Sequence, residues 1–186
     1  MSEHRFKGKP ARLRSSRRVK RLQVGRVVDL CLKGVVVRGT AAASVLDVGT
    51  GSALFAEIFA KRGLRVAGVD VSAEMVAAAR QVVPQGDFRH APAETLPFEN
   101  GTFDLVFMGL VLHELDDMVR GLAEARRVAR QRVAVLEWPY RPQLAGPLMS
   151  RRLPGTRVRA LAREAGFGAV DVVELESVVL YVLDVA

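Results

Sequence analysis

A glycine-rich turn after a short apolar stretch is the part of this chain whose residue types and spacing best suit chemistry. Residues 45–51 read Val-Leu-Asp-Val-Gly-Thr-Gly, and a stretch with helical spacing, 52–62, follows directly. Three apolar residues around Asp47 are typical of a strand that is buried on both faces. Gly49 and Gly51 allow a sharp turn with positive φ and leave no Cβ in the way of a ligand. Strand, glycine turn and helix in this order predict a nucleotide-binding unit.

The spacing after the glycines limits which nucleotide fits. A dinucleotide-binding turn reads G-x-G-x-x-G/A, and counting from Gly49 its third small residue falls on Leu54. A leucine there would crowd helix against strand, which disfavours a dehydrogenase. A second acid, Asp70, ends the next predicted strand. Its two oxygens could accept from the two hydroxyls of a ribose, or it could cap the following helix, a role that Ser72 could also fill.

His113 is the best candidate for a general base. It follows the predicted strand 103–108, on the side from which a second substrate would approach, although packing between helix and sheet explains it equally well. Trp138 and Tyr140 follow another strand, 132–137, and could form a wall for a planar substrate or simply pack. His113 on the one hand, and Trp138 and Tyr140 on the other, follow the ends of predicted strands, and an α/β sheet binds its ligand at strand ends.

An alternating α/β sheet is needed to bring these residues together. Strand-like spacing is found at 45–48, 65–70, 86–89, 103–108, 132–137, 168–174 and 178–185. Helical spacing is found at 17–32, 52–62, 73–82, 117–129 and 155–165. The order predicts one Rossmann-like, doubly wound, mostly parallel seven-stranded sheet with helices on both faces. The last two strands are joined too closely for a helical crossover, so we expect an antiparallel C-terminal pair.

Length and composition exclude several classes of protein. The 186 residues contain a single cysteine, Cys31, which excludes a disulfide framework and a cysteine-rich metal site, and we expect no metal. No apolar stretch reaches about 18 residues, so we expect no membrane span and a cytoplasmic protein. The stretch Ser177–Val185 is apolar enough to pair with a second chain, which leaves a monomer and a homodimer both open.

The net charge of +8 has an uneven source. Residues 1–26 hold ten of the 28 Lys and Arg against one acid, Glu3. Such an arm could bind nucleic acid or an anionic surface, or it could be a solvated lid with its cations facing water. A twin-arginine signal is disfavoured because no uninterrupted apolar stretch follows the arginines. We therefore expect a basic helical lid over residues 1–32 and one ligand-binding domain over residues 33–186.

The turn around Asp47 resembles the opening motif of the class I S-adenosylmethionine-dependent methyltransferases, in which Asp-x-Gly-x-Gly ends the first strand. The chain is similar to a small methyltransferase-domain subgroup (type 11-like) related to the methyltransferases of ubiquinone and menaquinone biosynthesis. The similarity rests on His4-Arg5-Phe6, Leu96-Pro97-Phe98, Val111 to Asp117, Gly146-Pro147 through Arg152-Leu153, and Ala165-Gly166-Phe167. It implies methyl transfer from S-adenosylmethionine, with S-adenosylhomocysteine as product, to a small or amphipathic molecule.

The resemblance also implies a set of site residues. Asp70 would accept hydrogen bonds from both ribose hydroxyls, and Gly109 would let the methionine part of the cofactor approach closely. The implied cofactor-binding residues are Asp47, Gly49, Thr50, Gly51, Asp70, Val71, Ala93, Glu94, Met108 and Gly109. The implied substrate pocket holds His113, Trp138, Tyr140 and Arg152.

The chain departs from the family pattern at three places. Ala53 stands for the third glycine of the turn, and Arg130-Gln131-Arg132 stands where relatives carry a Gly-Gly turn. Pro92 stands where relatives carry the acid that binds the adenine amino group, so this contact is lost unless Ala93 or Glu94 replaces it. One charged hydrogen bond contributes about 1.5–3 kcal/mol. We therefore expect weaker cofactor binding than a complete motif would give.

Rival functions fit parts of the sequence. A nucleic-acid (RNA) methyltransferase would suit the basic arm, but the expected Asn/Asp-Pro-Pro-aromatic motif is replaced by Met108-Gly109-Leu110-Val111. A non-catalytic cofactor-binding protein is suggested by Pro92. An arsenic methyltransferase would need several cysteines.

Overall fold

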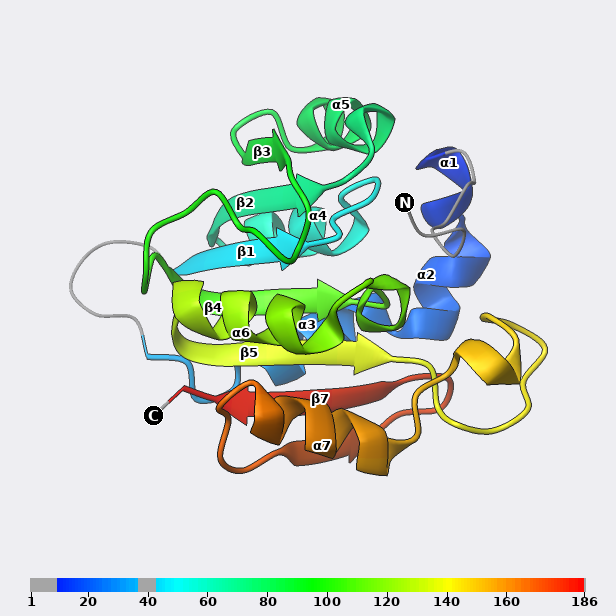
Figure 1. The fold of residues 1–186 in the computed structure, drawn as a ribbon. Coiled ribbons are helices and arrows are strands. Elements are labelled where there is room, and N and C mark those ends of the chain that lie inside the picture. Colours follow the sequence, from blue (N-terminus) through cyan, green and yellow to red (C-terminus); the bar gives the residue numbers. More distant parts are fainter. Residues whose placement is uncertain (1–9, 37–42, 186) are drawn as a thin grey trace.

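The computed structural model describes residues 10–36 and 43–185, which form one sheet covered by helices on both faces (Figure 1). The strands are β1 (Ser44–Val48), β2 (Arg65–Asp70), β3 (Asp87–His90), β4 (Phe103–Gly109), β5 (Ala129–Glu137), β6 (Asp171–Glu174) and β7 (Val179–Asp184). The helices are α1 (Pro10–Leu13), α2 (Ser16–Leu22), α3 (Val24–Leu32), α4 (Leu54–Lys61), α5 (Ala73–Val82), α6 (Met118–Val128) and α7 (Gly155–Glu164), with short 3-10 turns η1 (Leu112–Glu114) and η2 (Met149–Arg151).

The sheet has the predicted doubly wound topology. Its strand order is β3-β2-β1-β4-β5-β7-β6. The first five strands in this order are parallel, while β7 runs antiparallel to both β5 and β6. The mostly parallel seven-stranded sheet with an antiparallel C-terminal pair is thus confirmed. The order reverses at β1, between β2 and β4, and such a switch point is where an open α/β sheet binds its ligand.

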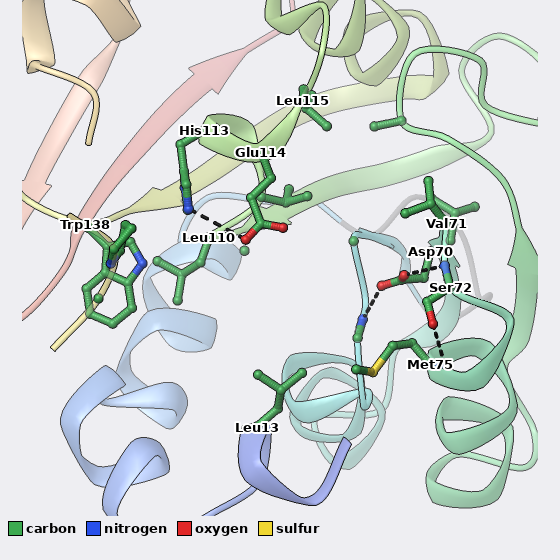
Figure 2. A pocket seen from close by; sticks show the side chains of 18 of the residues that line it. Leu13, Asp70, Val71, Ser72, Met75, Leu110, His113, Glu114, Leu115 and Trp138 are labelled. Atoms are coloured by element: carbon green, nitrogen blue, oxygen red, sulfur yellow. Dashed lines mark hydrogen bonds and ion pairs between the residues drawn. The ribbon is translucent and has the colours of Figure 1, made fainter. Parts of the chain in front are cut away.

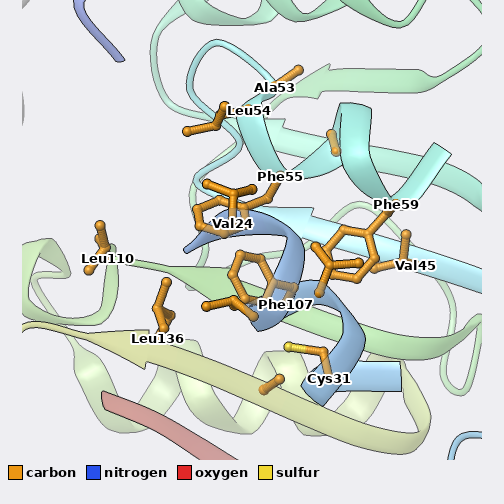
Figure 3. Close-up of a cluster of buried hydrophobic side chains, with 14 of the residues drawn as sticks. Val24, Cys31, Val45, Ala53, Leu54, Phe55, Phe59, Phe107, Leu110 and Leu136 are labelled. Carbon is orange, nitrogen blue, oxygen red and sulfur yellow. The ribbon is translucent and has the colours of Figure 1, made fainter. Parts of the chain in front are cut away.

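Alternating residues of the central strands build two core layers. Val45 of β1 belongs to a cluster with α3 and α4, while its neighbour Leu46 belongs to the opposite cluster with α6 and α7. Figure 3 shows the first cluster, in which Phe55 and Phe59 of α4 pack on Phe107 of β4 with ring centroids 4.7 and 5.5 Å apart. Burying each such ring contributes about 1.5–3 kcal/mol, so this layer fixes α4 on the sheet.

The N-terminal helical stretch differs from the prediction of one helix over 17–32. Gln23 adopts a left-handed conformation (φ 49°) and separates α2 from α3. The face of α3 that carries Val27, Val28 and Cys31 is buried in the core, and burial raises the pKa of the Cys31 thiol. Within the predicted lid of residues 1–32, α3 is thus part of the core, while α1 and α2 are the described helices that lie outside it.

The C-terminal strand also differs from the prediction. We expected Ser177–Val185 to be exposed and able to pair with a second chain, but β7 lies between β5 and β6 and is hydrogen-bonded on both edges. The edges of the described sheet are β3 and β6 instead. Among residues 10–36 and 43–185, no helix is long and apolar enough to cross a bilayer.

Candidate active site

The glycine turn leaves β1 at the switch point of the sheet. Gly49 and Gly51 both have positive φ, of 68° and 53°. A Cβ on Gly49 would lie 2.5 Å from Cγ2 of Val111, so the turn has no room for a side chain. Ala53, at the third position of the motif, also adopts the left-handed region with φ 58°, immediately before α4 begins. A non-glycine residue in this region lowers the stability of the fold by about 1–2 kcal/mol. Glycine would therefore fit the position of Ala53 better.

Asp47 lies behind this turn rather than in front of it. Its side chain is buried, and Oδ2 accepts a hydrogen bond of 2.9 Å from the hydroxyl of Thr50. Burial raises the pKa of Asp47 to about 7, against the opposing effect of the Thr50 hydrogen bond. The pair therefore stabilises the shape of the turn.

Asp70 ends β2 beside the glycine turn (Figure 2). Its Oδ2 accepts from the backbone N–H of Gly51 at 2.8 Å, and its Oδ1 accepts from the N–H of Ser72 at 2.9 Å. The cap of α5 is Ser72, whose hydroxyl accepts from the N–H of Met75. Asp70 is thus not needed as the helix cap, and two backbone donors orient its carboxylate.

These residues surround a cavity of about 550 Å³ at the carboxyl ends of the parallel strands. Seven of the ten predicted cofactor-binding residues line it: Gly49, Gly51, Asp70, Val71, Ala93, Glu94 and Gly109. Next to Asp70 the wall is apolar, with side chains that suit a flat ring: Val71, Met75, Ala91, Ala93 and Leu115. The cavity thus has the oriented carboxylate of Asp70 beside an apolar slot formed by these side chains.

The opposite part of the cavity holds His113. Its Nδ1 donates to Glu137, with distances of 2.8 Å to Oε2 and 3.0 Å to Oε1, and its Nε2 lies 3.8 Å from Oε1 of Glu114. Glu137 also accepts from the backbone N–H groups of His113 and Trp138. Burial lowers the pKa of His113, but the hydrogen bond and charge of Glu137 outweigh it, so the pKa is raised overall. An imidazole held at Nδ1 by a carboxylate presents Nε2 as its proton-accepting atom.

The chain is similar in sequence to known methyltransferases. Residues 46–136 match the model of a family described as "Methyltransferase domain". A demethylmenaquinone methyltransferase of Chlorobaculum parvum is 36% identical over 95 residues, which cover 50% of this chain and 39% of that protein. A malonyl-[acyl-carrier protein] O-methyltransferase of Pectobacterium atrosepticum is 31% identical over 86 residues, which cover 46% and 34%. The chain therefore spans well under half the length of these two relatives.

A solved structure matches over a much larger share of the chain. A SAM-dependent methyltransferase from Aquifex aeolicus superimposes with a TM-score of 0.82, at 24% identity, over 97% of this chain and 100% of that one. The chain belongs to the class I S-adenosylmethionine-dependent methyltransferases. In this chain the glycine turn follows the first strand, β1, as the family motif implied.

The residues that line the cavity fit S-adenosylmethionine by their chemistry. Asp70 suits a diol, the apolar slot suits a purine, and the glycine turn allows close approach. Arg18 also lines the cavity, and its Nε is buried with no hydrogen-bond partner among the described residues. Burial and the charge of Arg21 lower the pKa of Arg18. A buried donor without a partner is expected to find one in a ligand.

Three predicted cofactor residues do not line this cavity. Asp47 and Thr50 lie behind the turn, and Met108 is fully buried in the core layer beneath it. Glu94 does line the cavity, but its Oε1 accepts from the backbone N–H of Asp116 at 3.1 Å. Glu94 thus holds the start of α6, so it is a poor replacement for the missing acid at Pro92.

The predicted substrate residues divide in the same way. His113 and Trp138 line the cavity, whereas Tyr140 is 55% exposed and does not. Arg152 is buried below the loop that follows β5, where its guanidinium donates to backbone carbonyls of Pro139, Arg141, Ala145 and Pro147. Arg152 does not line the cavity, because these bonds hold its guanidinium inside the loop.

Several further residues line the cavity that were not singled out from the sequence, and they come from segments far apart in the chain: Leu13, Arg18, Arg21, Ala145 and Arg151. The spacing of Arg18 and Arg21, on one face of α2, was a signal for two of them. Among the described residues, no group of three or more His, Cys, Asp and Glu is arranged to hold a metal.

Proposed function

We propose that this methyltransferase binds S-adenosylmethionine in the cavity and transfers its methyl group to a small or amphipathic acceptor in the cytoplasm. The observation that carries the proposal is the position of Asp70, which two backbone N–H groups orient at the edge of the cavity. The slot beside it would hold the adenine, with the N–H of Ala93 as a donor to the ring. Arg18 would provide a cation for the carboxylate at the other end of the cofactor.

The chemistry demands little from the protein. The bound cofactor supplies a methyl group that is already activated on a sulfonium, so the chain has to place the acceptor in line with it. His113 would take a proton from an acceptor hydroxyl or amine through Nε2, while Glu137 stabilises the positive charge that then forms on the ring. Trp138 would form an apolar wall for the acceptor.

The names of the relatives do not select one acceptor. One is named for demethylmenaquinone and the other for a malonyl-[acyl-carrier protein], which are chemically unlike acceptors. What this chain shares with each of them extends over about half of its length. The proposal is therefore limited to an acceptor that enters beside His113.

Calorimetric titration with S-adenosylmethionine and S-adenosylhomocysteine tests the cofactor part. We expect micromolar binding of both ligands, weakened about 10- to 100-fold by Asp70→Asn because charged hydrogen bonds are lost. The matched control is Asp171→Asn, which neutralises an exposed carboxylate at the start of β6, away from the cavity. If the folded chain binds neither ligand, the methyltransferase proposal is wrong and Pro92 marks a lost site.

A further inference from the structure

Exposed apolar side chains gather on one loop beside the cavity. Five large hydrophobic residues are strongly exposed among the described residues, and three of them lie between β5 and η2: Tyr140 (55%), Leu144 (108%) and Leu148 (77%). This segment, residues 139–148, is called the rim loop below. Figure 1 shows it at the same end of the sheet as α2. Arg18 and Arg21 of α2 and residues 145–147 of the rim loop line the cavity, so Leu144 and Leu148 directly flank lining residues in the chain.

The rim loop is held in place by its own contacts. Arg152 donates to the carbonyls of Arg141, Ala145 and Pro147, at 2.6, 2.8 and 3.0 Å. Gly146 has a positive φ of 94°, and a Cβ there would lie 2.7 Å from the Trp138 ring. A loop fixed in this way cannot turn its leucines inward without losing these bonds, so their exposure is a property of the folded molecule.

The two segments beside the cavity are basic, whereas the acids of the site, Asp70, Glu94 and Glu114, lie in the wall of the cavity itself. Residues 10–22 contain six cations and no acid, and residues 139–152 contain three cations and no acid: Arg12, Arg14, Arg17, Arg18, Lys20, Arg21, Arg141, Arg151 and Arg152. Those that point into solvent at this end include Arg17, Lys20 and Arg141, which are exposed. Exposed apolar side chains bordered by Lys and Arg are the combination that binds an anionic membrane interface.

We propose that the rim loop and α2 dock on an anionic lipid bilayer, with Leu144 and Leu148 entering the headgroup region and the cations facing lipid phosphates. The cavity then opens toward the membrane, so an acceptor can pass from the lipid into the site without crossing water. This docking goes beyond the proposed methyl transfer and does not depend on it. An RNA would also attract the cations, but it gains nothing from the exposed side chains of Leu144 and Leu148, which favours lipid.

Sedimentation with vesicles tests the docking. We expect the full chain to bind phosphatidylcholine vesicles that contain phosphatidylglycerol, and to bind pure phosphatidylcholine much less. The double variant Leu144→Ser/Leu148→Ser should lower the binding about tenfold. Arg17→Gln and Lys20→Gln should each lower it about fivefold, because each cation near an anionic surface contributes about that factor. Val36→Ser is the matched control, since Val36 is 61% exposed but lies away from the cavity, and its binding should not change.

Three results would overturn the docking: no binding to the anionic vesicles, equal binding by the leucine double variant, or binding of a single-stranded RNA that is tighter and insensitive to both leucines. Light scattering tests whether the rim loop instead binds a second copy of this chain. A dimer of the unchanged chain that the leucine double variant dissociates would also contradict the docking on lipid. Calorimetry with S-adenosylhomocysteine on every variant keeps the two proposals separate. If the chain binds S-adenosylhomocysteine but not the vesicles, only the docking is contradicted. If it binds the vesicles but not S-adenosylhomocysteine, only the methyl transfer is contradicted.

Discussion

At the scale of single residues, the pairing of His113 with Glu137 has consequences for catalysis. His113→Gln keeps a polar side chain of similar reach but cannot accept a proton, so we expect methyl transfer to fall by about 100-fold or more. The affinity for S-adenosylhomocysteine should stay unchanged, since His113 lies at the acceptor end of the cavity. The measurement is transfer of a labelled methyl group to a hydroxyl or amine acceptor found by screening. A rate equal to that of the unchanged chain would assign His113 to packing alone.

The same pair should make the stability of the protein depend on pH. The pKa of His113 is raised above its ordinary value of 6.5, so the stabilisation is complete below that pH and is lost as the pH rises through the raised pKa. Below pH 6.5 we expect Glu137→Gln to lower the free energy of unfolding by about 1.5–3 kcal/mol. The difference between the two chains should then narrow as the pH rises.

Urea unfolding at several pH values measures this difference. The pKa of Asp47 is raised to about 7, so Asp47 also lowers the stability as the pH rises. This loss is the same in the unchanged protein and in Glu137→Gln, so the difference between the two in free energy of unfolding reports on His113. The control is Glu174→Gln, which changes an exposed carboxylate on β6. A constant gap between the chains across the whole range would show that His113 is not charged in the folded protein.

How well single residues could be predicted depended on whether a regular element carries them. Gly49, Gly51 and Asp70 follow strands directly, so their common edge of the sheet follows from the strand pattern. Tyr140 and Arg152 lie on a loop with no periodicity, and nothing local says which side chain faces the cavity. For Arg152 the burial depends on carbonyls up to 13 residues away in the chain, a contact that no spacing rule predicts.

At the scale of elements, the glycine turn after β1 is expected to be intolerant of any side chain. Gly49→Ala adds a left-handed alanine and a contact of 2.5 Å to Val111, so we expect a loss of about 2–4 kcal/mol in the free energy of unfolding. Adding Val111→Ala removes Cγ2 at 2.5 Å but keeps Cβ at 2.9 Å, so we expect it to recover only part of the loss that is due to the contact. Thermal unfolding of the single and double variants measures both.

The matched control for this pair is Val111→Ala alone, which should cost about 1–2 kcal/mol for the lost apolar contacts. If the double variant is no more stable than Gly49→Ala, the contact with Cγ2 of Val111 is not what excludes a side chain. The loss would then come from φ and from the contact with Cβ of residue 111.

Other element boundaries show where local patterns stop being informative. Helical spacing continues through residue 23, so the sequence gives no sign of the break between α2 and α3, which a left-handed Gln23 makes without glycine. The start of β5 at Ala129, three residues before the predicted one, lies next to an irregular register with β4. Both features are decided by packing on neighbouring elements, which overrides local preference.

At the scale of the whole molecule, the alternation of strands and helices was enough to predict the sheet, because parallel strands need helical crossovers. It could not say which of the last two strands lies outermost, since both orders satisfy a short connection. The structure places apolar β7 inside and the short β6 at the edge. Asp171 and Glu174 stand at the two ends of β6, and both are exposed. Short length and end charges are the means by which edge strands avoid pairing with other chains.

Removing these charges should therefore change the oligomeric state. With β6 as it is, we expect the chain to stay monomeric in light scattering, and Asp171→Val/Glu174→Val to associate or aggregate, because Val172 and Val173 then continue as an uncharged apolar edge. The double variant Glu74→Val/Glu164→Val removes the same charge from exposed positions on α5 and α7. If both double variants associate equally, net charge rather than the open edge of β6 keeps the molecules apart. If neither does, four residues are too short an edge to template pairing, and the end charges of β6 do not matter for it.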